Sequence, residues 1–317
     1  MTTSNETQKK SRSTEMRRFL ITGATGKQGG SVVNSLVEYR AKLPSDQKFE
    51  IICVTRNTSS EKAISLASTD GVSVIPGNLF FPLSAFDRAF PIDAVFCMTC
   101  PGDLGDEEKQ ATAIIDASLT HGVKHFVFTS VDRGGAELSE TNPTEIPHFK
   151  SKYNVEKYLK EKCAESQMTW TILRPVGFMD NLMPNFTGKG FAAIWAQLGK
   201  KPLQLVSARD IGHFGAVALL HPEEYAGRAV GLAGDELNFE EAQKVFRETM
   251  GYEMPRTWTF VASLIGFALP EMGQMFKWLR EEGYAVDIKG LREEYPELQD
   301  FKTWLKESSQ LMRSLQT

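Results

Sequence analysis

The sequence predicts an α/β protein with a doubly wound parallel sheet and a smaller, mainly helical C-terminal lobe. Short apolar runs alternate with amphipathic stretches from the N-terminal part of the chain as far as Pro175. A glycine triplet lies where the first apolar run passes into the first amphipathic stretch. Beyond Pro175 the alternation weakens, and the second lobe is expected to begin there.

The alternation defines repeated strand–helix units, in which each helix returns the chain to a parallel neighbouring strand. Strands are recognised as short apolar runs, and helices by apolar residues at helical spacing. We expect strands at residues 18–22, 50–55, 72–75, 93–99, 125–130 and 169–173. We expect helices at residues 28–39, 60–67, 106–120 and 148–165, then at 211–220 and 240–250.

Three regions follow from this pattern. Residues 1–16 are polar and lack the apolar stretch of a secretory signal, so we expect a disordered leader. Residues 17–175 form the first domain. Residues 176–317 form a smaller lobe that supplies the wall of a substrate cleft, with some segments returning to the core of the first domain.

Composition and charge disfavour several classes of function. The net charge is −4, so the chain has no general basic field for nucleic acid. The longest apolar run, residues 261–269, is far shorter than the ~20 residues that cross a bilayer. Four cysteines are too few for a disulfide framework and indicate a reducing compartment. We expect a cytoplasmic protein, also nuclear if it is regulatory, that binds small molecules or proteins.

The glycine triplet has the spacing G-x-x-G-x-x-G at the junction of the first strand and its helix. Glycine is needed there because a side chain would keep a pyrophosphate away from the backbone amides and the helix dipole. With a strand before it and a helix after it, the motif predicts a Rossmann-type dinucleotide site. The cofactor-binding residues predicted from this loop are Gly23, Thr25, Gly26, Lys27, Gln28 and Gly29.

The choice of dinucleotide depends on the end of the second strand. A carboxylate there would accept from the ribose 2′-hydroxyl of NAD, whereas an arginine would meet the 2′-phosphate of NADP. This chain has Arg56 and no acid before Glu61. Arg56 therefore predicts NADP(H), with Ser60 among the neighbouring donors.

The ends of the next strands line the same crevice in this fold. Asn78 and Leu79 would flank the adenine, and Thr99, Cys100 and Pro101 would lie near the pyrophosphate and the nicotinamide ribose. Cys97 and Cys100 spell C-x-x-C, but they end a strand, so their side chains diverge across the sheet. We expect neither a redox pair nor a metal site.

Several segments together resemble the NmrA-like family of atypical short-chain dehydrogenases. They are T-G-A-T-G-K-Q-G-G (residues 22–30), F-V-F-T-S (126–130), P-H-F-K-S-K-Y-N-V-E (147–156), L-R-P-V-G-F-M-D-N (173–181) and S-A-R-D-I-G (207–212). The resemblance covers about residues 17–310. It implies either an NADP-binding redox sensor and transcription co-regulator, or a reductase of the kind found in related branches.

The dehydrogenase pattern Y-x-x-S-K-x-x-x-E fits this chain in one of two registers. Residues 148–156 match its Ser, Lys and Glu with His148 in place of Tyr, whereas residues 153–157 are a literal Y-x-x-x-K. At 100° per residue, His148 and Lys152 share the face of the apolar residues Val155, Leu159 and Cys163. Tyr153, Lys157 and Lys160 point to solvent. The first register is favoured, and the resemblance supports it because sensor members also have His before this Lys.

This register gives three candidate catalytic residues. The resemblance implies that Lys152 binds the nicotinamide ribose. His148 can donate a proton near neutral pH, and Ser130 would orient a carbonyl. The missing Tyr leaves an alternative open, in which His148 only stabilises the start of its helix after Pro147.

Several further residues have predicted roles. The resemblance implies that Gly177 and Phe178 border the nicotinamide. The loop of Asp132 and Arg133 either reaches the cleft or forms a surface salt bridge. Asp210 is expected to cap a helix that starts at Ile211. Where sensor members have a further cofactor lysine this chain has Thr112, and Lys109 is the nearest substitute.

The sequence is consistent with two functions. The first is an NADPH-dependent oxidoreductase that passes hydride to a carbonyl, enone, imine or quinone. The second is a non-catalytic NADP(H)-sensing regulator that binds a protein partner. The substrate and the oligomeric state stay open.

Overall fold

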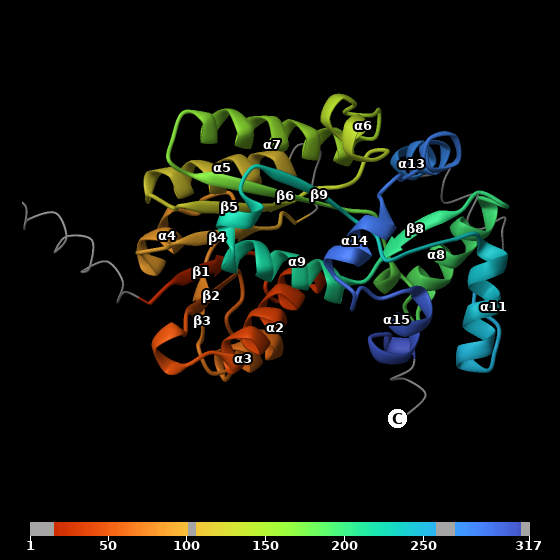
Figure 1. Ribbon diagram of the computed structural model, residues 1–317, viewed down its shortest axis with the longest axis horizontal. Helices are drawn as coiled ribbons and strands as arrows, with labels where there is room; N and C mark the ends of the chain where they lie inside the picture. The colour runs from red at the N-terminus through yellow and green to blue at the C-terminus, as the bar shows by residue number, and fades with distance from the viewer. Residues whose placement is uncertain (1–15, 101–105, 258–269, 312–317) are drawn as a thin grey trace, which may run out of the picture.

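The computed structural model describes residues 16–100, 106–257 and 270–311, and in this part of the chain it forms two lobes. The larger contains a parallel sheet between two layers of helices, and the smaller lies beyond one end of that sheet (Figure 1). This is the expected doubly wound fold. Of the expected leader, residues 1–16, only Met16 is among the described residues. The apolar run 261–269 also lies outside them.

The large sheet has seven strands in the order β3-β2-β1-β4-β5-β6-β9, and all neighbours are parallel. Its strands are nearly continuous apolar runs because helices cover both faces. The strand order reverses between β1 and β4, and such a switch point is where Rossmann folds bind a dinucleotide. The strands are β1 (Arg18–Ile21), β2 (Glu50–Thr55), β3 (Val72–Pro76), β4 (Ala94–Cys97), β5 (His125–Thr129), β6 (Thr169–Pro175) and β9 (Arg228–Leu232).

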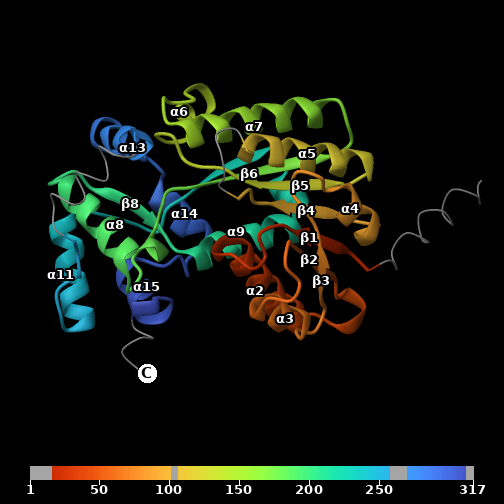
Figure 2. The ribbon, with the colours of Figure 1, turned by 180° about the vertical axis from the view of Figure 1, so that it is seen from behind.

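Two groups of helices cover the faces of this sheet, as the view from behind also shows (Figure 2). On one face, Val32, Val33 and Leu36 of α2 are buried with residues of α9. On the other, α4 and α5 pack with Val155 and Leu159 of α7. The helices are α2 (Lys27–Lys42), α3 (Glu61–Ala67) and α9 (Ala208–Leu220), and then α4 (Leu83–Ala89), α5 (Asp106–Thr120) and α7 (Pro147–Ala164). The short α6 (Ala136–Thr141) and α10 (Pro222–Tyr225) lie at connections.

The smaller lobe combines a three-stranded sheet, in the order β10-β8-β7, with five helices among the described residues. Trp195 packs edge-on against Phe239 and Phe301, with ring centroids 6.0 and 5.8 Å away, and so joins three of these helices. The elements are β7 (Gly177–Phe178), β8 (Leu203–Val206), β10 (Asp235–Leu237), α8 (Phe186–Gln197), α11 (Phe239–Met250), α13 (Pro270–Glu281), α14 (Ile288–Glu294) and α15 (Phe301–Glu307).

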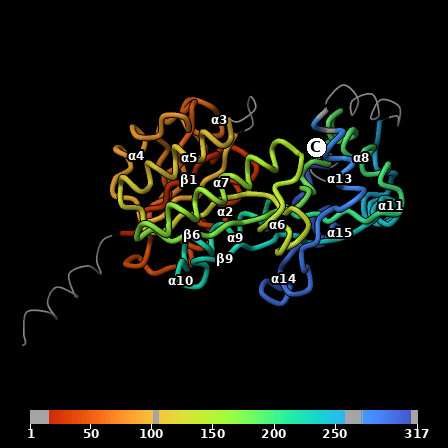
Figure 3. Tube along the Cα trace, turned by 90° about the horizontal axis from the view of Figure 1, so that it is seen from above, coloured from red at the N-terminus to blue at the C-terminus, as the bar shows by residue number. Residues whose placement is uncertain are grey.

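The chain leaves β6 at Pro175 and enters β7 at Gly177, so the smaller lobe lies beyond the carboxyl ends of the parallel strands (Figure 3). Later it returns to the large sheet, where β9 pairs with β6. The sequence signal for β9 is weak, since its five residues include an arginine and a glycine. No helix in the described part of the chain is long and apolar enough to span a membrane.

The prediction that Asp210 caps α9 is wrong. The helix starts at Ala208, not Ile211, and the side chain of Ser207 accepts from the N–H of Asp210 at 3.0 Å. Asp210 is fully buried in the first turn, where one carboxylate oxygen accepts from the N–H of Gln299 at 3.0 Å. Burial raises the pKa of this carboxyl to about 6. Asp210 therefore joins α9 to the smaller lobe.

Candidate functional site

The glycine loop joins β1 to α2 and leaves bare backbone at the start of a long helix. Gly23 has a φ of +63°, a conformation that side chains disfavour. A Cβ at Gly29 would lie 2.5 Å from the carbonyl carbon and oxygen of Gly23, so glycine lets the helix approach the loop. Gly26 begins the helix without a side-chain cap, and the first turn has no acidic residue. This end of α2 fits a pyrophosphate.

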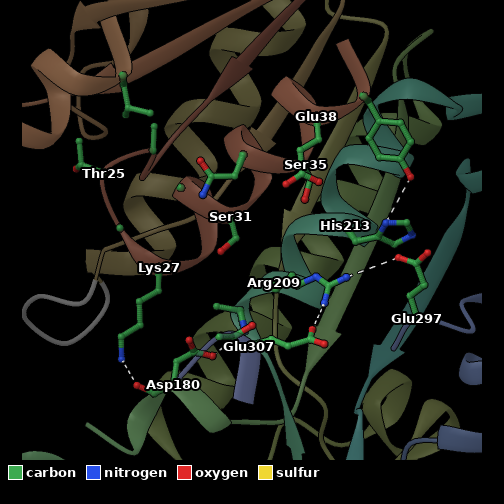
Figure 4. A pocket seen from close by; sticks show the side chains of 18 of the residues that line it. Thr25, Lys27, Ser31, Ser35, Glu38, Asp180, Arg209, His213, Glu297 and Glu307 are labelled. Carbon is green, nitrogen blue, oxygen red and sulfur yellow. Dashed lines mark hydrogen bonds and ion pairs between the residues drawn. The ribbon is translucent and has the colours of Figure 1, made fainter. Parts of the chain in front are cut away.

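Two side chains of the loop contact other segments. The Lys27 ammonium donates to the backbone oxygen of Asp180 at 2.6 Å and so spans from the loop to the smaller lobe (Figure 4). Burial lowers the pKa of Lys27, although the charge of Asp180 opposes this. Gln28 accepts from the hydroxyl of Thr129, at the end of β5, at 2.7 Å. The loop is thus held to a strand end and to the second lobe.

A cavity of about 920 Å³ opens beside the loop and follows the outer face of α2 (Figure 4). Its walls come from α2, α3, α9 and the segments after α14 and α15. Of the predicted cofactor residues it includes Thr25, Gly26 and Lys27, and neither His148 nor Lys152 lines it. The cavity therefore adjoins the predicted dinucleotide crevice and does not contain its nicotinamide end.

The residues predicted to bind the adenosine part lie at the ends of β2 and β3. Arg56 directly follows β2, is exposed, and makes no hydrogen bond or ion pair with another described residue. Ser60 caps α3 by accepting from a backbone N–H of the first turn at 3.3 Å. Asn78 is exposed and accepts from a backbone N–H two residues later at 3.0 Å, and Leu79 is half-buried. The Arg56 guanidinium thus has no partner among the described residues.

Lys152 lies in a compact polar cluster beyond the end of β4. Its ammonium donates to the Thr99 hydroxyl at 2.6 Å and pairs with Glu107 Oε1 at 3.1 Å. The Thr99 hydroxyl in turn donates to Glu107 at 2.8 Å. Burial opposes the charge of Glu107, but Lys152 and Thr99 outweigh it and hold the pKa of this carboxyl below its ordinary value. A lysine has three N–H donors, and one donor of Lys152 has no hydrogen-bond partner among the described residues.

Cys100, which directly follows Thr99, is held by its backbone. The Gln110 amide accepts from the N–H of Cys100 at 2.9 Å and donates to its carbonyl at 3.1 Å. Cys97 is fully buried, and burial raises the pKa of its thiol to about 12, which disfavours the reactive thiolate. Pro101 lies outside the described residues.

His148 lies in the first turn of α7, one turn before Lys152. Its Nδ1 is 2.5 Å from Oε1 of Glu271, the second residue of α13 in the smaller lobe. The imidazole remains 37% exposed. His148 also contributes to the low pKa of Glu107, which places it in the same electrostatic environment as Lys152. The structure therefore gives His148 a carboxylate partner that the sequence did not reveal.

Ser130 differs from its expected role. It is 6% exposed, and its hydroxyl donates to Glu156 of α7. Glu156 also pairs with Arg133 at 3.0 Å and with Arg174 at 2.5 Å, and all three ionic side chains are buried. The hydroxyl therefore belongs to a buried ion cluster beneath the strand ends, where its proton is donated to Glu156.

The loop of Asp132 and Arg133 forms neither a cleft wall nor a surface salt bridge, because both residues are buried. Asp132 accepts from the backbone N–H groups of Gly134 and Gly135, and from that of Ala285 at 3.2 Å. Its carboxylate thus shapes the loop after β5 and attaches the chain after α13 to it. The prediction of a cleft wall or a surface salt bridge was wrong because the sequence does not show which loop is covered by a second lobe.

The face expected for α7 agrees with the burial of Val155, Leu159 and Cys163. Of the residues expected in solvent, only Lys157 is exposed. The ring of Tyr153 is half-buried, with the Arg133 guanidinium 5.3 Å from its centroid. Lys160 is likewise half-buried, 2.5 Å from Glu140.

The remaining residues predicted to lie near the cofactor are on separate elements. Gly177 and Phe178 form β7 and are half-buried, with Phe178 paired to Val206. Lys109 is 70% exposed and pairs with Asp106 at 3.8 Å, so it does not replace the lysine expected from the family pattern. Glu107 was not among the predicted residues, although its place in the acidic first turn of α5, the helix that follows β4, was a usable signal.

Comparisons with known proteins identify relatives over most of the chain. The model of the NmrA-like family matches residues 15–304. The NmrA-like oxidoreductase malD of Malbranchea aurantiaca is 27% identical over 75% of this chain and 74% of its own length. An NAD(P)H azoreductase of Xenophilus azovorans is 28% identical over 64% of each chain.

One solved structure shares the fold at low identity. The Citrobacter sp. triphenylmethane reductase, solved with NADP(H), superposes with a TM-score of 0.70 at 20% identity, over 92% of this chain and all of that one. The strand order, the glycine loop and the family match over nearly the whole chain agree. This chain belongs to the NmrA-like family.

Proposed function

We propose that the protein is an NADPH-dependent oxidoreductase that reduces a small organic acceptor, namely a carbonyl, enone, imine or quinone, by hydride transfer. The observation that carries the proposal is the Lys152 ammonium, which Thr99 and Glu107 hold beyond the end of β4 with one N–H donor to spare. A named oxidoreductase and a named azoreductase among the relatives support it. So does the triphenylmethane reductase, which was solved with NADP(H).

The residues present fit such a cofactor. The bare start of α2 would bind the pyrophosphate, and a Cβ at Gly29 would close that cradle. Arg56 would bind the 2′-phosphate, and Lys152 would donate to the nicotinamide ribose. When bound, the cofactor supplies the hydride from its nicotinamide ring. His148 holds the proton that neutralises the reduced oxygen or nitrogen of the acceptor.

The first test is turnover. We expect NADPH to be oxidised in the presence of at least one member of a panel of quinones, azo dyes, enones, imines and aldehydes. His148→Ala should lower kcat by about 100-fold, the lower range for a lost general acid, with little change in the NADPH Kd. His221→Ala, which alters a half-exposed histidine outside the site, is the control. Unchanged turnover in His148→Ala would remove the imidazole from the mechanism.

Arg56 provides a separate test of the cofactor choice. Because its guanidinium has no described partner, we expect Arg56→Ala to weaken NADPH binding by about tenfold or more and to leave NADH binding unchanged. Titration of nucleotide fluorescence gives both dissociation constants. Arg88→Ala, at an exposed position on α4, is the matched control. Equal losses for NADPH and NADH would contradict the assignment of Arg56 to the 2′-phosphate.

The alternative is a sensor without turnover that binds a protein partner. His148 in place of the usual Tyr favours it, and NmrA, a negative transcriptional regulator, has a similar structure with a TM-score of 0.68 at 15% identity. Tight NADPH binding with no oxidation across the panel, together with a partner whose binding depends on the cofactor, would favour this function over the enzyme.

A further inference from the structure

We infer that Glu271 is the positioning residue of His148 and that the two form a carboxylate–imidazole pair across the lobes. In this pair Nδ1 is committed to Glu271, and Nε2 is the atom that exchanges a proton with the acceptor. The inference rests on the proposed function and deepens it, because it assigns the proton to one atom and makes that atom depend on the smaller lobe.

The contact joins an imidazole nitrogen to a carboxylate oxygen within hydrogen-bond distance. Nδ1 of His148 lies 2.5 Å from Oε1 of Glu271, closer than the ~2.7–2.9 Å usual for a charge-assisted N–H···O bond. A carboxylate only accepts, so the proton between them is carried by Nδ1. The ring also meets Phe149 edge-on, with centroids 4.6 Å apart. Nε2 has no hydrogen-bond partner among the described residues, and the imidazole is 37% exposed.

The contacts of α13 show why Glu271 stays beside α7. Trp278 of α13 packs edge-on against Phe149 of α7, with centroids 5.1 Å apart. Glu282, directly after α13, accepts from the side-chain amide of Asn142 at 3.4 Å and from the Trp278 indole at 3.0 Å. These contacts attach α13 to the start of α7, so the pair forms where the two lobes meet.

The proton step follows from this arrangement. Transferring the proton from Nε2 to the reduced oxygen or nitrogen breaks one N–H bond and forms one O–H or N–H bond. The imidazole that remains keeps its proton on Nδ1, still bonded to Glu271, and solvent returns a proton to Nε2. Glu271 therefore fixes both the tautomer and the direction of the ring, in the way that carboxylates orient histidines in other acid–base pairs.

The variant that tests the pair is Glu271→Ala, because the side chain is 48% exposed at the start of its helix and its loss leaves no buried cavity. Glu281→Ala is the matched control. It makes the same truncation in the same helix at a 61% exposed residue whose ion-pair partner is Lys277, 4.0 Å away. The full chain is labelled with ¹⁵N-histidine, and the His148 signals are assigned by their loss in His148→Asn.

We expect the neutral His148 ring to carry its proton on Nδ1 in the native chain. In Glu271→Ala the signals should shift toward the Nε2–H tautomer that free imidazoles prefer, while Glu281→Ala matches the native spectrum. In turnover, kcat should fall at least tenfold in Glu271→Ala, with KM for NADPH changed less than twofold. Glu271→Asp should restore part of the loss.

The outcomes separate the inference from the proposed function. An unchanged tautomer in Glu271→Ala overturns the pair whether or not the protein turns over. A shifted tautomer with native kcat, while His148→Ala loses turnover, overturns the positioning role and leaves the enzyme proposal standing. If no acceptor of the panel supports NADPH oxidation by the native chain, the proposed function fails and the proton-transfer role of His148 fails with it. The spectra still decide whether the pair of His148 and Glu271 exists.

Discussion

A Gly29→Ala variant is expected to bind NADPH about 100-fold more weakly than the native chain, which corresponds to about 2.7 kcal/mol of binding free energy. The added Cβ would lie 2.5 Å from the carbonyl carbon and oxygen of Gly23 and 2.6 Å from the carbonyl oxygen of Thr22. All three are backbone atoms that no side-chain rotation can move. Relief requires a shift of the helix or loop by about 1 Å, a displacement large enough to cost a preorganised site about 100-fold.

The measurement is the NADPH Kd by fluorescence titration, with the thermal midpoint recorded to show that each variant is folded. Gly190→Ala is the matched control, because Gly190 lies inside α8 and a Cβ there meets no atom within 4 Å. It should bind NADPH as the native chain does and be slightly more stable, since alanine favours helix. Native affinity in a folded Gly29→Ala would show that the pyrophosphate is not bound at this loop.

A Glu156→Gln variant is expected to lower the free energy of unfolding by about 3–5 kcal/mol, the range for breaking a buried ion pair from one side. Glu156 is 2% exposed and is the carboxylate that both Arg133 and Arg174 contact. Burial opposes the charge of Arg174, but Glu156 and Glu140 outweigh it and hold its pKa above the ordinary value. The amide would leave these buried guanidinium groups with less compensating charge.

Urea denaturation of both variants measures the loss, and Glu140→Gln is the control. Glu140 contacts the same Arg174 at 2.7 Å but is 46% exposed, so its removal should cost less than about 1 kcal/mol. Equal losses for the two variants would show that burial of the cluster does not determine its energy. Native stability in Glu156→Gln would mean that the amide satisfies both arginines.

Elements that depend on local sequence were predicted well. The strand 50–55 and the helix 106–120 have the bounds that their periodicity indicated. The face of α7 that carries Lys152 also followed from spacing, because the apolar residues of a helix face the sheet they cover. Strand β9 was not predicted because its local signal is weak. It pairs with β6 at the edge of the large sheet.

Side-chain partners were predicted less well. Ser130 directly follows β5, and that position alone did not show that its hydroxyl would donate to Glu156, 26 residues later. Arg133 has the sequence context of a surface loop, yet it is buried, and its guanidinium donates to Glu156, 23 residues later. In both cases the deciding partner is distant in the chain.

Periodicity and the backbone freedom of glycine were enough to predict the fold class, the glycine loop at the start of α2 and the place of Arg56 after β2. Which charges meet depends instead on how the elements pack. Glu107 reaches Lys152 across 45 residues, and Glu271 reaches His148 across 123. A hydrogen bond depends on the direction and distance of two side chains, and those are fixed only when the helices that carry them have packed together.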